Sequence, residues 1–213
     1  MESKSHWEKI YVSKSVSELS WFQVEARLSL AFIQRFAPDP QAFIADVGGG
    51  ASTLVDGLLK AGYKNVTVID LSSAALAEAR ERLGGAASQV IWLEANALEQ
   101  VLPKASVDFW HDRAVFHFLT NPRDRARYLE QVRRALRHEG HILIAAFAED
   151  GPQQCSGLEV ARYSVSALQA QLGEDFQLVS AEREDHTTPA NVHQAFQYCV
   201  FKYVPSNLEH FAP

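Results

Sequence analysis

A run of three glycines preceded by a carboxylate is the first place in this sequence where chemistry is expected. The segment Asp46-Val47-Gly48-Gly49-Gly50 ends a short apolar run that begins at Phe43, and helix-forming residues follow it from Leu54. Glycines between a strand and a helix let the backbone turn tightly and approach a ligand closely. We therefore interpret residues 46–50 as part of a cofactor site rather than as a turn that serves chain geometry alone.

The neighbouring residues indicate what kind of cofactor this loop would hold. A dinucleotide fingerprint needs a third glycine three residues after the second, but Thr53 stands there. A phosphate-binding P-loop is also excluded, since no Gly-Lys-Ser/Thr sequence follows. The carboxylate of Asp46 would repel a pyrophosphate and attract a cation. The pattern favours a cationic cofactor without phosphate groups.

Two further polar residues follow apolar runs. Asp70 ends the run that starts at Val66, and a carboxylate at that place accepts hydrogen bonds from both hydroxyls of a ribose. Asn96 follows the run that starts at Val90, and its side-chain oxygen is also a hydrogen-bond acceptor. An exposed acid at a strand end and an ordinary loop asparagine are the alternative interpretations.

The elements that must position these residues alternate along the chain. Apolar, β-rich runs are separated by helix-forming stretches, which is typical of a doubly wound α/β fold with helices on both faces of a mainly parallel sheet. Two successive strands near the end predict a C-terminal antiparallel hairpin in a seven-stranded sheet. We expect helices over 23–36, 54–61, 73–83, 123–137 and 166–172, and strands over 43–47, 66–69, 90–93, 107–110, 141–147, 176–182 and 195–203.

Length and composition limit the function classes. The chain has 213 residues, of which 47% are hydrophobic, so one domain over 23–213 is expected after a lead-in segment over 1–22. The net charge of -6 gives no basic surface for nucleic acid. Two cysteines, Cys155 and Cys199, make neither a disulfide framework nor a metal site. With no signal-like or membrane-spanning run, we expect a cytoplasmic protein without a membrane partner.

The segment Asp46 to Ser52 resembles the acidic-x-Gly-x-Gly signature of class I S-adenosylmethionine (SAM)-dependent methyltransferases. The resemblance covers roughly residues 40–147 and implies SAM as cofactor, S-adenosylhomocysteine as product and a Rossmann-like fold. Asn96 departs from it, because the family usually has an aspartate that accepts a bond from the adenine amino group. The cofactor contacts that it implies come from Asp46, Gly48, Gly49, Gly50, Asp70, Leu71, Asn96, Ala97, Asp112 and Arg113.

The lead-in segment contains an aromatic pattern, Trp7-x3-Tyr11, followed by Trp21. It resembles the N-terminal region of small-molecule methyltransferases and of some protein-lysine methyltransferases, where such a segment folds over the cofactor. Tyr11 and Trp21 are therefore expected to be lid residues at the cofactor. Aromatic packing against the edge of the sheet is the alternative.

The acceptor side is less well marked. His111 and His117 flank the end of the predicted fourth strand and are the candidates for a general base, because imidazole titrates near neutral pH. Arg162, Tyr163 and His186 are the candidates for contacts with the acceptor, on loops beside the predicted site. Cys155 is expected to be an ordinary loop thiol.

Three functions agree with these patterns. Methyl transfer from a sulfonium is a direct displacement that depends chiefly on positioning, so no covalent catalytic residue is required. The sequence at 111–114, His-Asp-Arg-Ala, replaces the Asn/Asp-Pro-Pro-Tyr/Phe motif of enzymes that methylate nucleobase or glutamine amino groups. A small-molecule acceptor is favoured, a protein lysine is the first alternative, and a dinucleotide-binding Rossmann-like protein is the second.

Overall fold

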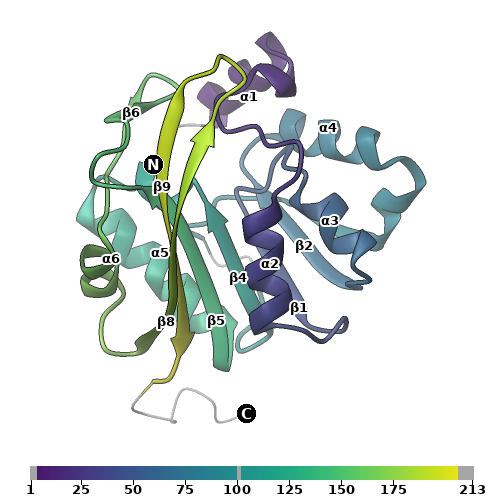
Figure 1. Ribbon diagram of the computed structural model, residues 1–213. Helices are drawn as coiled ribbons and strands as arrows, with labels where there is room; N and C mark the ends of the chain where they lie inside the picture. Colours follow the sequence, from purple (N-terminus) through teal and green to yellow (C-terminus); the bar gives the residue numbers. More distant parts are fainter. Residues whose placement is uncertain (1–3, 100–101, 206–213) are drawn as a thin grey trace.

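Seven strands form a single sheet in the computed structural model, which describes residues 4–99 and 102–205. The strand order is β3-β2-β1-β4-β5-β9-β8, and β9 runs antiparallel to both β5 and β8 while the other pairs are parallel (Figure 1). This arrangement confirms the predicted mainly parallel sheet with a C-terminal hairpin. The strands are β1 Phe43–Val47, β2 Asn65–Asp70, β3 Val90–Glu94, β4 Val107–Arg113, β5 Leu136–Phe147, β8 Phe176–Thr187 and β9 His193–Tyr203.

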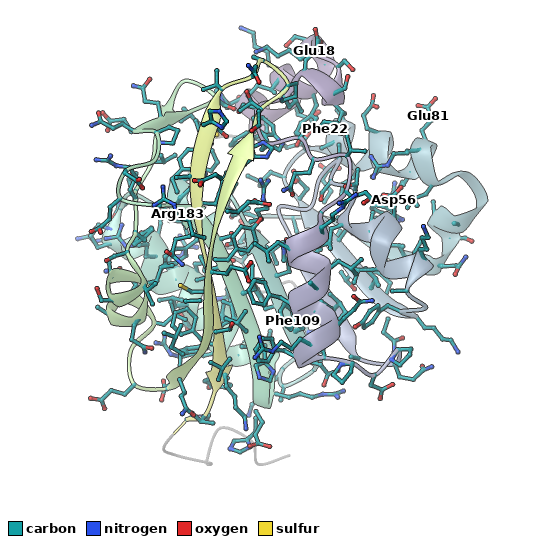
Figure 2. All side chains as sticks on the ribbon, in the orientation of Figure 1. Glu18, Phe22, Asp56, Glu81, Phe109 and Arg183 are labelled. Atoms are coloured by element: carbon teal, nitrogen blue, oxygen red, sulfur yellow. The ribbon has the colours of Figure 1, made fainter. Side chains whose placement is uncertain are left out.

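Helices cover both faces of this sheet, each face having its own apolar core. One core joins the sheet to α5 and α6, and the other joins it to α2, α3 and α4. Figure 2 shows Phe109 of β4 in the second core, beside α2. The helices are α1 Lys4–Ser13, α2 Arg27–Phe36, α3 Leu54–Lys60, α4 Ser73–Leu83, α5 Pro122–Ala135 and α6 Val165–Leu172, with short 3₁₀ turns η1 Val16–Glu18, η2 Gly84–Gln89 and η3 Phe116–Phe118.

Local chemistry explains where several helices begin. The Ser72 hydroxyl accepts a hydrogen bond from the backbone N–H of Ala75, which makes Ser72 the N-cap of α4. The side chain of Asn121 caps α5 in the same way, and Pro122 occupies the first helical position, where its missing N–H costs nothing.

Some element boundaries differ from those that the sequence predicts. Helix α2 begins at Arg27 instead of residue 23, and Val24 is 80% exposed although it fits the helical spacing. Strand β4 continues to Arg113, so His111 lies inside the strand rather than after it. Residues expected to form a loop make a small hairpin of β6 Gln154–Cys155 and β7 Leu158–Glu159. Cys155 is therefore a strand residue, which corrects its interpretation as a loop thiol.

The sheet topology creates a crevice above β1. The chain continues from β1 to β2 on one side, whereas β4 pairs with β1 on the other side. Ligands of open α/β sheets bind at such a switch point, outside the carboxyl ends of the strands. Within the described ranges, no helix combines the length and apolarity that a bilayer span requires.

Candidate functional site

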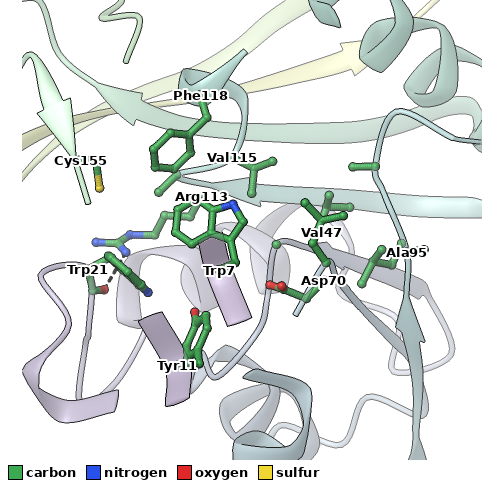
Figure 3. Close-up of a pocket in the computed structure, with 15 residues that line it drawn as sticks. Trp7, Tyr11, Trp21, Val47, Asp70, Ala95, Arg113, Val115, Phe118 and Cys155 are labelled. Atoms are coloured by element: carbon green, nitrogen blue, oxygen red, sulfur yellow. Dashed lines mark hydrogen bonds between the residues drawn. The ribbon is translucent and has the colours of Figure 1, made fainter. Parts of the chain in front are cut away.

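A cavity of about 750 Å³, a volume that includes solvent space at its mouth, lies at the carboxyl ends of the central strands. In Figure 3, Asp70 and Arg113 stand on opposite sides of it. Strands β1 to β3 and the residues after them form one side, and the end of β4, α1 and β6 form the other. The lining residues are Trp7, Tyr11, Trp21, Val47, Gly48, Ile69, Asp70, Leu71, Ala95, Ala97, Arg113, Ala114, Val115, Phe118 and Cys155.

Two glycines of the predicted loop are required by close contacts. Gly48 has φ +67°, and a β-carbon added to it would collide with the Val115 side chain. Gly50 has φ +40°, and a β-carbon there would lie 2.8 Å from Asp70 Oδ2 and 3.0 Å from the Tyr11 hydroxyl. Only glycine adopts such backbone angles at little cost. The loop therefore keeps the backbone close to the cavity and to Asp70.

Asp70 ends β2 with its carboxylate at the cavity. The backbone N–H of Ser72 donates to Asp70 Oδ1 at 2.8 Å, which fixes the side chain. Burial raises the pKa of Asp70 to about 7, despite the hydrogen bonds that favour its charged form. A buried carboxylate with a free acceptor edge is suited to bind ligand hydroxyl groups, as the sequence predicts.

A second cavity of about 500 Å³ adjoins the first along Tyr11, Trp21, Gly48 and Arg113. Asp46, Gly49 and His111 also line it. Asp46 Oδ1 lies 2.7 Å from His111 Nδ1, and Asp46 Oδ2 is buried without a hydrogen-bond partner among the described residues. The free Oδ2 atom is thus an acceptor available for a ligand cation.

Arg113 brings a buried positive charge to both cavities. Its side chain is 9% exposed, Nε donates to the Tyr198 hydroxyl at 2.8 Å, and Nη1 donates to the Trp21 carbonyl at 3.0 Å. Nη2 lies 3.6 Å from Glu184 Oε2 and makes no hydrogen bond with a described residue. The guanidinium is held in place by the sheet and retains one nitrogen for a ligand anion.

Helix α1 forms the roof of the cavity. Trp7 makes edge contacts with Phe118 and Trp21, with ring centroids 5.0 and 6.0 Å apart, and Tyr11 contacts Trp21 at 6.3 Å. The Glu8 carboxylate, on the same helix, accepts hydrogen bonds from the first backbone N–H groups of α4. Both predicted lid residues, Tyr11 and Trp21, therefore line the cavity, while their contact with a cofactor stays a prediction.

Three of the other predicted residues do not line either cavity. Asp112 points to the opposite face of β4 from Arg113, because side chains alternate along a strand, and accepts hydrogen bonds from Tyr128 and from the N–H groups of η3. His117 is fully buried between Phe118 and Phe147, and burial lowers its pKa to about 3. Asn96 Oδ1 accepts from the Leu98 N–H at 3.0 Å, so its contact with adenine stays a prediction.

The candidate base His111 lines the second cavity, but both of its ring nitrogens are engaged. Nδ1 faces Asp46, and Nε2 lies 2.9 Å from the Ser29 hydroxyl of α2. Because an ionised carboxylate can only accept, the Nδ1–H group donates to Asp46. The geometry supports a structural bridge between β1, β4 and α2, and a catalytic role for His111 stays a prediction.

The three predicted acceptor contacts lie away from the cavities. Arg162 is exposed and donates to the Glu149 and Gly151 carbonyl groups. Tyr163 is buried against Phe116, and His186 binds the Ser20 carbonyl at 2.8 Å.

Several lining residues were not predicted from the sequence. Val115 precedes η3, Phe118 is the last residue of η3, and Cys155 lies on β6. The positions of these segments depend on the packing of the sheet. The sequence does indicate that Trp7 lies beside Tyr11, because it stands four residues before Tyr11 and therefore shares its helix face. Burial raises the pKa of the Cys155 thiol to about 11, which keeps it protonated at neutral pH.

Comparisons with known proteins agree with this geometry. Residues 45–144 match the family model described as a methyltransferase domain. The chain is 22% identical over 141 residues to the mouse (Mus musculus) eEF1A lysine and N-terminal methyltransferase. That match covers 66% of this chain and only 20% of the relative, so the chain spans about a fifth of its length.

Solved structures have the same fold. One of them comes from work on the conversion of a disulfide bond into a thioacetal group during echinomycin biosynthesis. It has a TM-score of 0.77 at 15% sequence identity, and the match covers 96% of this chain and 93% of that chain. The 1,6-didemethyltoxoflavin-N1-methyltransferase of Burkholderia thailandensis, solved with 1,6-didemethyltoxoflavin and S-adenosylhomocysteine, has a TM-score of 0.69 at 18% identity and covers 95% and 84%. The glycine loop, the acid that ends β2 and the sheet order agree with the family match, which assigns residues 45–144 to a methyltransferase domain.

Proposed function

We propose that this chain transfers the methyl group of SAM to a small-molecule acceptor. The observation that carries the proposal is the distribution of charge along the two adjoining cavities. Asp70 stands at one end, and Asp46 and Arg113 stand at the other, with Gly48 between the two cavities. This order matches the ribose, the sulfonium and the amino-acid group of an extended SAM molecule.

The residues present fit each part of SAM. Asp70 would accept hydrogen bonds from the ribose hydroxyl groups, with Leu71 and Ala97 beside the adenine. Asp46 Oδ2 would accept from the α-ammonium group, and Arg113 Nη2 would donate to the α-carboxylate. These last two atoms have no hydrogen-bond partner in the described structure, and a buried polar atom without a hydrogen bond is costly. A zwitterion supplies both missing partners at once.

When it is bound, SAM supplies an electrophilic methyl group on a sulfonium. The chain itself contributes orientation and exclusion of water. The Gly48 backbone turns at the junction of the cavities, where a side chain would obstruct the cofactor. Trp7, Tyr11 and Trp21 cover the same place from above. Alignment of two reactants in this way lowers an activation barrier by up to about 7–11 kcal/mol.

The contacts that hold the roof in place support a small acceptor over a protein side chain. Helix α1 is tied to α4 through Glu8 and to η3 through Trp7 and Phe118. A lysine inserted from a folded protein would need an open channel through this roof. A protein acceptor is the alternative, because one relative is an eEF1A lysine and N-terminal methyltransferase.

Calorimetry with three ligands tests the placement of the cofactor. SAM carries both the ammonium and the carboxylate, its decarboxylated form lacks the carboxylate, and 5′-methylthioadenosine lacks both groups. Loss of the carboxylate should weaken binding to the wild type by about 1.5–3 kcal/mol, the range of a charge-assisted hydrogen bond. Arg113→Met should bind SAM and decarboxylated SAM equally.

Tyr198→Phe is the matched control, since it removes the hydroxyl that holds Arg113 Nε but leaves the guanidinium in place. It should keep most of the discrimination between the two ligands. If Arg113→Met still prefers SAM as strongly as the wild type does, Arg113 does not bind the carboxylate. Labelled methyl groups from SAM should then appear in the small-molecule fraction of a cell extract, and label confined to protein would contradict the acceptor assignment.

A further inference from the structure

The side of the first cavity that faces away from β1 to β3 is mainly apolar. We define the acceptor end as Trp7, Trp21, Ala114, Val115, Phe118 and Cys155, all of which line the cavity. The side chains of Trp7, Trp21 and Phe118 are only half-buried in the described structure. Figure 3 shows these side chains grouped around the guanidinium of Arg113. Apolar and aromatic surface of this kind binds flat apolar ligands.

No general base lines the acceptor end within residues 4–99 and 102–205. His117 is enclosed in the core, His186 binds the Ser20 carbonyl, and Asp112 is engaged on the opposite face of β4. His111 is held between Asp46 and Ser29. Cys155, the one titratable group of the acceptor end, is protonated at neutral pH because burial raises its pKa. An acceptor that must lose a proton during the reaction finds no partner for it here.

The charges near the acceptor end also select against cations. Asp70 and Arg113 are the charged side chains that line the first cavity, and Asp70 stands on the ribose side. An ammonium acceptor would meet the Arg113 guanidinium and the sulfonium of the cofactor, with no carboxylate to pair with. A protonated amine has no lone pair to attack with, and with a pKa near 10.4 it is deprotonated in fewer than about one molecule in a thousand at pH 7.

We propose that the acceptor is a flat aromatic molecule without a positive charge, whose nucleophile, a ring nitrogen or the thiolate of an acidic thiol, presents a lone pair at neutral pH without an enzymic base. This inference rests on the proposed function and names its acceptor class. The lone pair forms the bond to the methyl carbon while the carbon–sulfur bond breaks, and its electron pair stays on the sulfur of S-adenosylhomocysteine. A ring nitrogen becomes an N-methyl cation, and a thiol has released its proton to water.

Four probes on one bicyclic frame test this acceptor class. They are isoquinoline, 2-naphthalenethiol, 2-naphthol and 2-naphthylmethylamine, each supplied with labelled SAM, and a lysine-containing peptide is a fifth. At pH 7 we expect methylation of isoquinoline or of the thiol, at rates at least about 100-fold above those of the naphthol and the amine. The rate with the naphthol should rise about tenfold per pH unit up to its own pKa, because solvent must remove its proton.

Binding gives a second readout that does not depend on turnover. With S-adenosylhomocysteine bound, isoquinoline should quench indole fluorescence from Trp7 and Trp21 at lower concentration than naphthylmethylamine does. Phe118→Leu should raise the KM for the methylated aromatic probe by a larger factor than it raises the Kd for SAM. Trp92→Phe, which changes an indole outside the cavity, is the control for the fluorescence assignment.

The outcomes separate this inference from the proposed function. Faster methylation or tighter binding of the amine or the lysine peptide overturns the acceptor class, and so does a naphthol rate that is already constant at neutral pH. Absence of any aromatic methylation or binding, with normal SAM affinity in calorimetry, also overturns it while the cofactor site stands. Failure to bind SAM would overturn both.

Discussion

The Glu8 carboxylate lies 2.5 Å from the backbone nitrogen of Ser73, so an acid on α1 caps the N-terminus of α4. The N–H groups of the first helical turn have no partner within the helix and carry partial positive charge. A second oxygen of the same carboxylate accepts from the Ala74 N–H at 3.3 Å. The roof of the cavity is therefore fastened to the half of the fold that carries Asp70.

Glu8→Ala should loosen this roof. A capping interaction is worth about 1 kcal/mol, so S-adenosylhomocysteine should dissociate about fivefold faster. Stopped-flow tryptophan fluorescence measures this rate. Lys4→Ala is the control, because it breaks the exposed ion pair with Glu94 and leaves the hydrogen bonds of Glu8 to α4 in place. Equal dissociation rates for Glu8→Ala and the wild type would mean that α1 does not retain the ligand.

Gly48→Ala should abolish detectable SAM binding. The added β-carbon meets Val115, and the residue has φ +67°, so the loop must shift or remain strained by about 1–3 kcal/mol. Gly85→Ala is a matched control, since a β-carbon at that position has no heavy atom within 4 Å. It should keep both the Tm and the affinity of the wild type. Normal SAM binding by Gly48→Ala would place the cofactor elsewhere.

The affinity for SAM should rise with pH through neutrality. Burial raises the pKa of Asp70 to about 7, and ribose hydroxyl groups donate to its ionised form, so binding must release a proton below that pH. The Kd should fall by up to about tenfold per pH unit below pH 7 and level off above it. Calorimetry in buffers with different ionisation enthalpies reports the proton release directly.

Asp70→Ala should remove this pH dependence and weaken SAM binding by about 1.5–3 kcal/mol. The control is Glu81→Gln, an exposed carboxylate on α4 (Figure 2). If the pH profile survives in Asp70→Ala, another group is responsible for it.

The raised pKa of Asp70 also predicts how the free energy of unfolding depends on pH in the absence of cofactor. The pKa of Asp70 in the folded chain lies above its unfolded value near 3.9, and that of Asp112 is also raised by burial, to about 6. The folded state therefore binds more protons between those values. The contribution of both groups to the free energy of unfolding is largest below pH 4 and is lost as the pH rises through 6 to 7. Urea titrations of the wild type and Asp70→Asn measure it.

The two cysteines should be unreactive in the native chain. Burial raises the pKa of Cys155 to about 11 and that of Cys199 to about 12, so little thiolate exists at neutral pH. Iodoacetamide labelling followed by mass spectrometry should be at least about 100-fold slower than for a free thiol. S-adenosylhomocysteine should further protect Cys155, which lines the cavity, and leave Cys199 unchanged. Fast labelling of Cys155 would contradict its buried position.

Local patterns were sufficient to predict the sheet and several of the residues that line the cavities at the carboxyl ends of its strands. Asp46, Gly48 and Asp70 stand next to short apolar strands, and the carboxyl ends of parallel strands meet at one edge. The three residues are therefore placed by topology alone. Tyr11 and Trp21 were predicted from the resemblance of the lead-in segment to the N-terminal region of other methyltransferases.

The residues of the acceptor end could not be predicted, because their positions depend on where β4 ends and on how distant segments pack. The fourth strand ends at Arg113, three residues later than its apolar run suggests, and this extension decides which side chains face the cavities. His111 and Arg113 share one face, whereas Asp112 faces α5. The predicted start of α2 was wrong, because Val24 follows the spacing of the helix but precedes its first turn. Phe118 and Cys155 reach the cavity only through packing of distant segments.

The contacts that hold residues 20–23 set an order for biosynthesis. His186 binds the Ser20 carbonyl across a sequence separation of 166, and Glu184 Oε1 accepts a hydrogen bond from Gln23 at 2.9 Å. Both partners belong to β8, which pairs only with β9. A chain leaving the ribosome exposes its N-terminal segment first, yet that segment obtains these partners only after the final hairpin has emerged and paired. A nascent chain stopped before β8 therefore has its glycine loop and the Glu8 and Arg113 contacts of the roof, but residues 20–23 still lack the partners that β8 supplies.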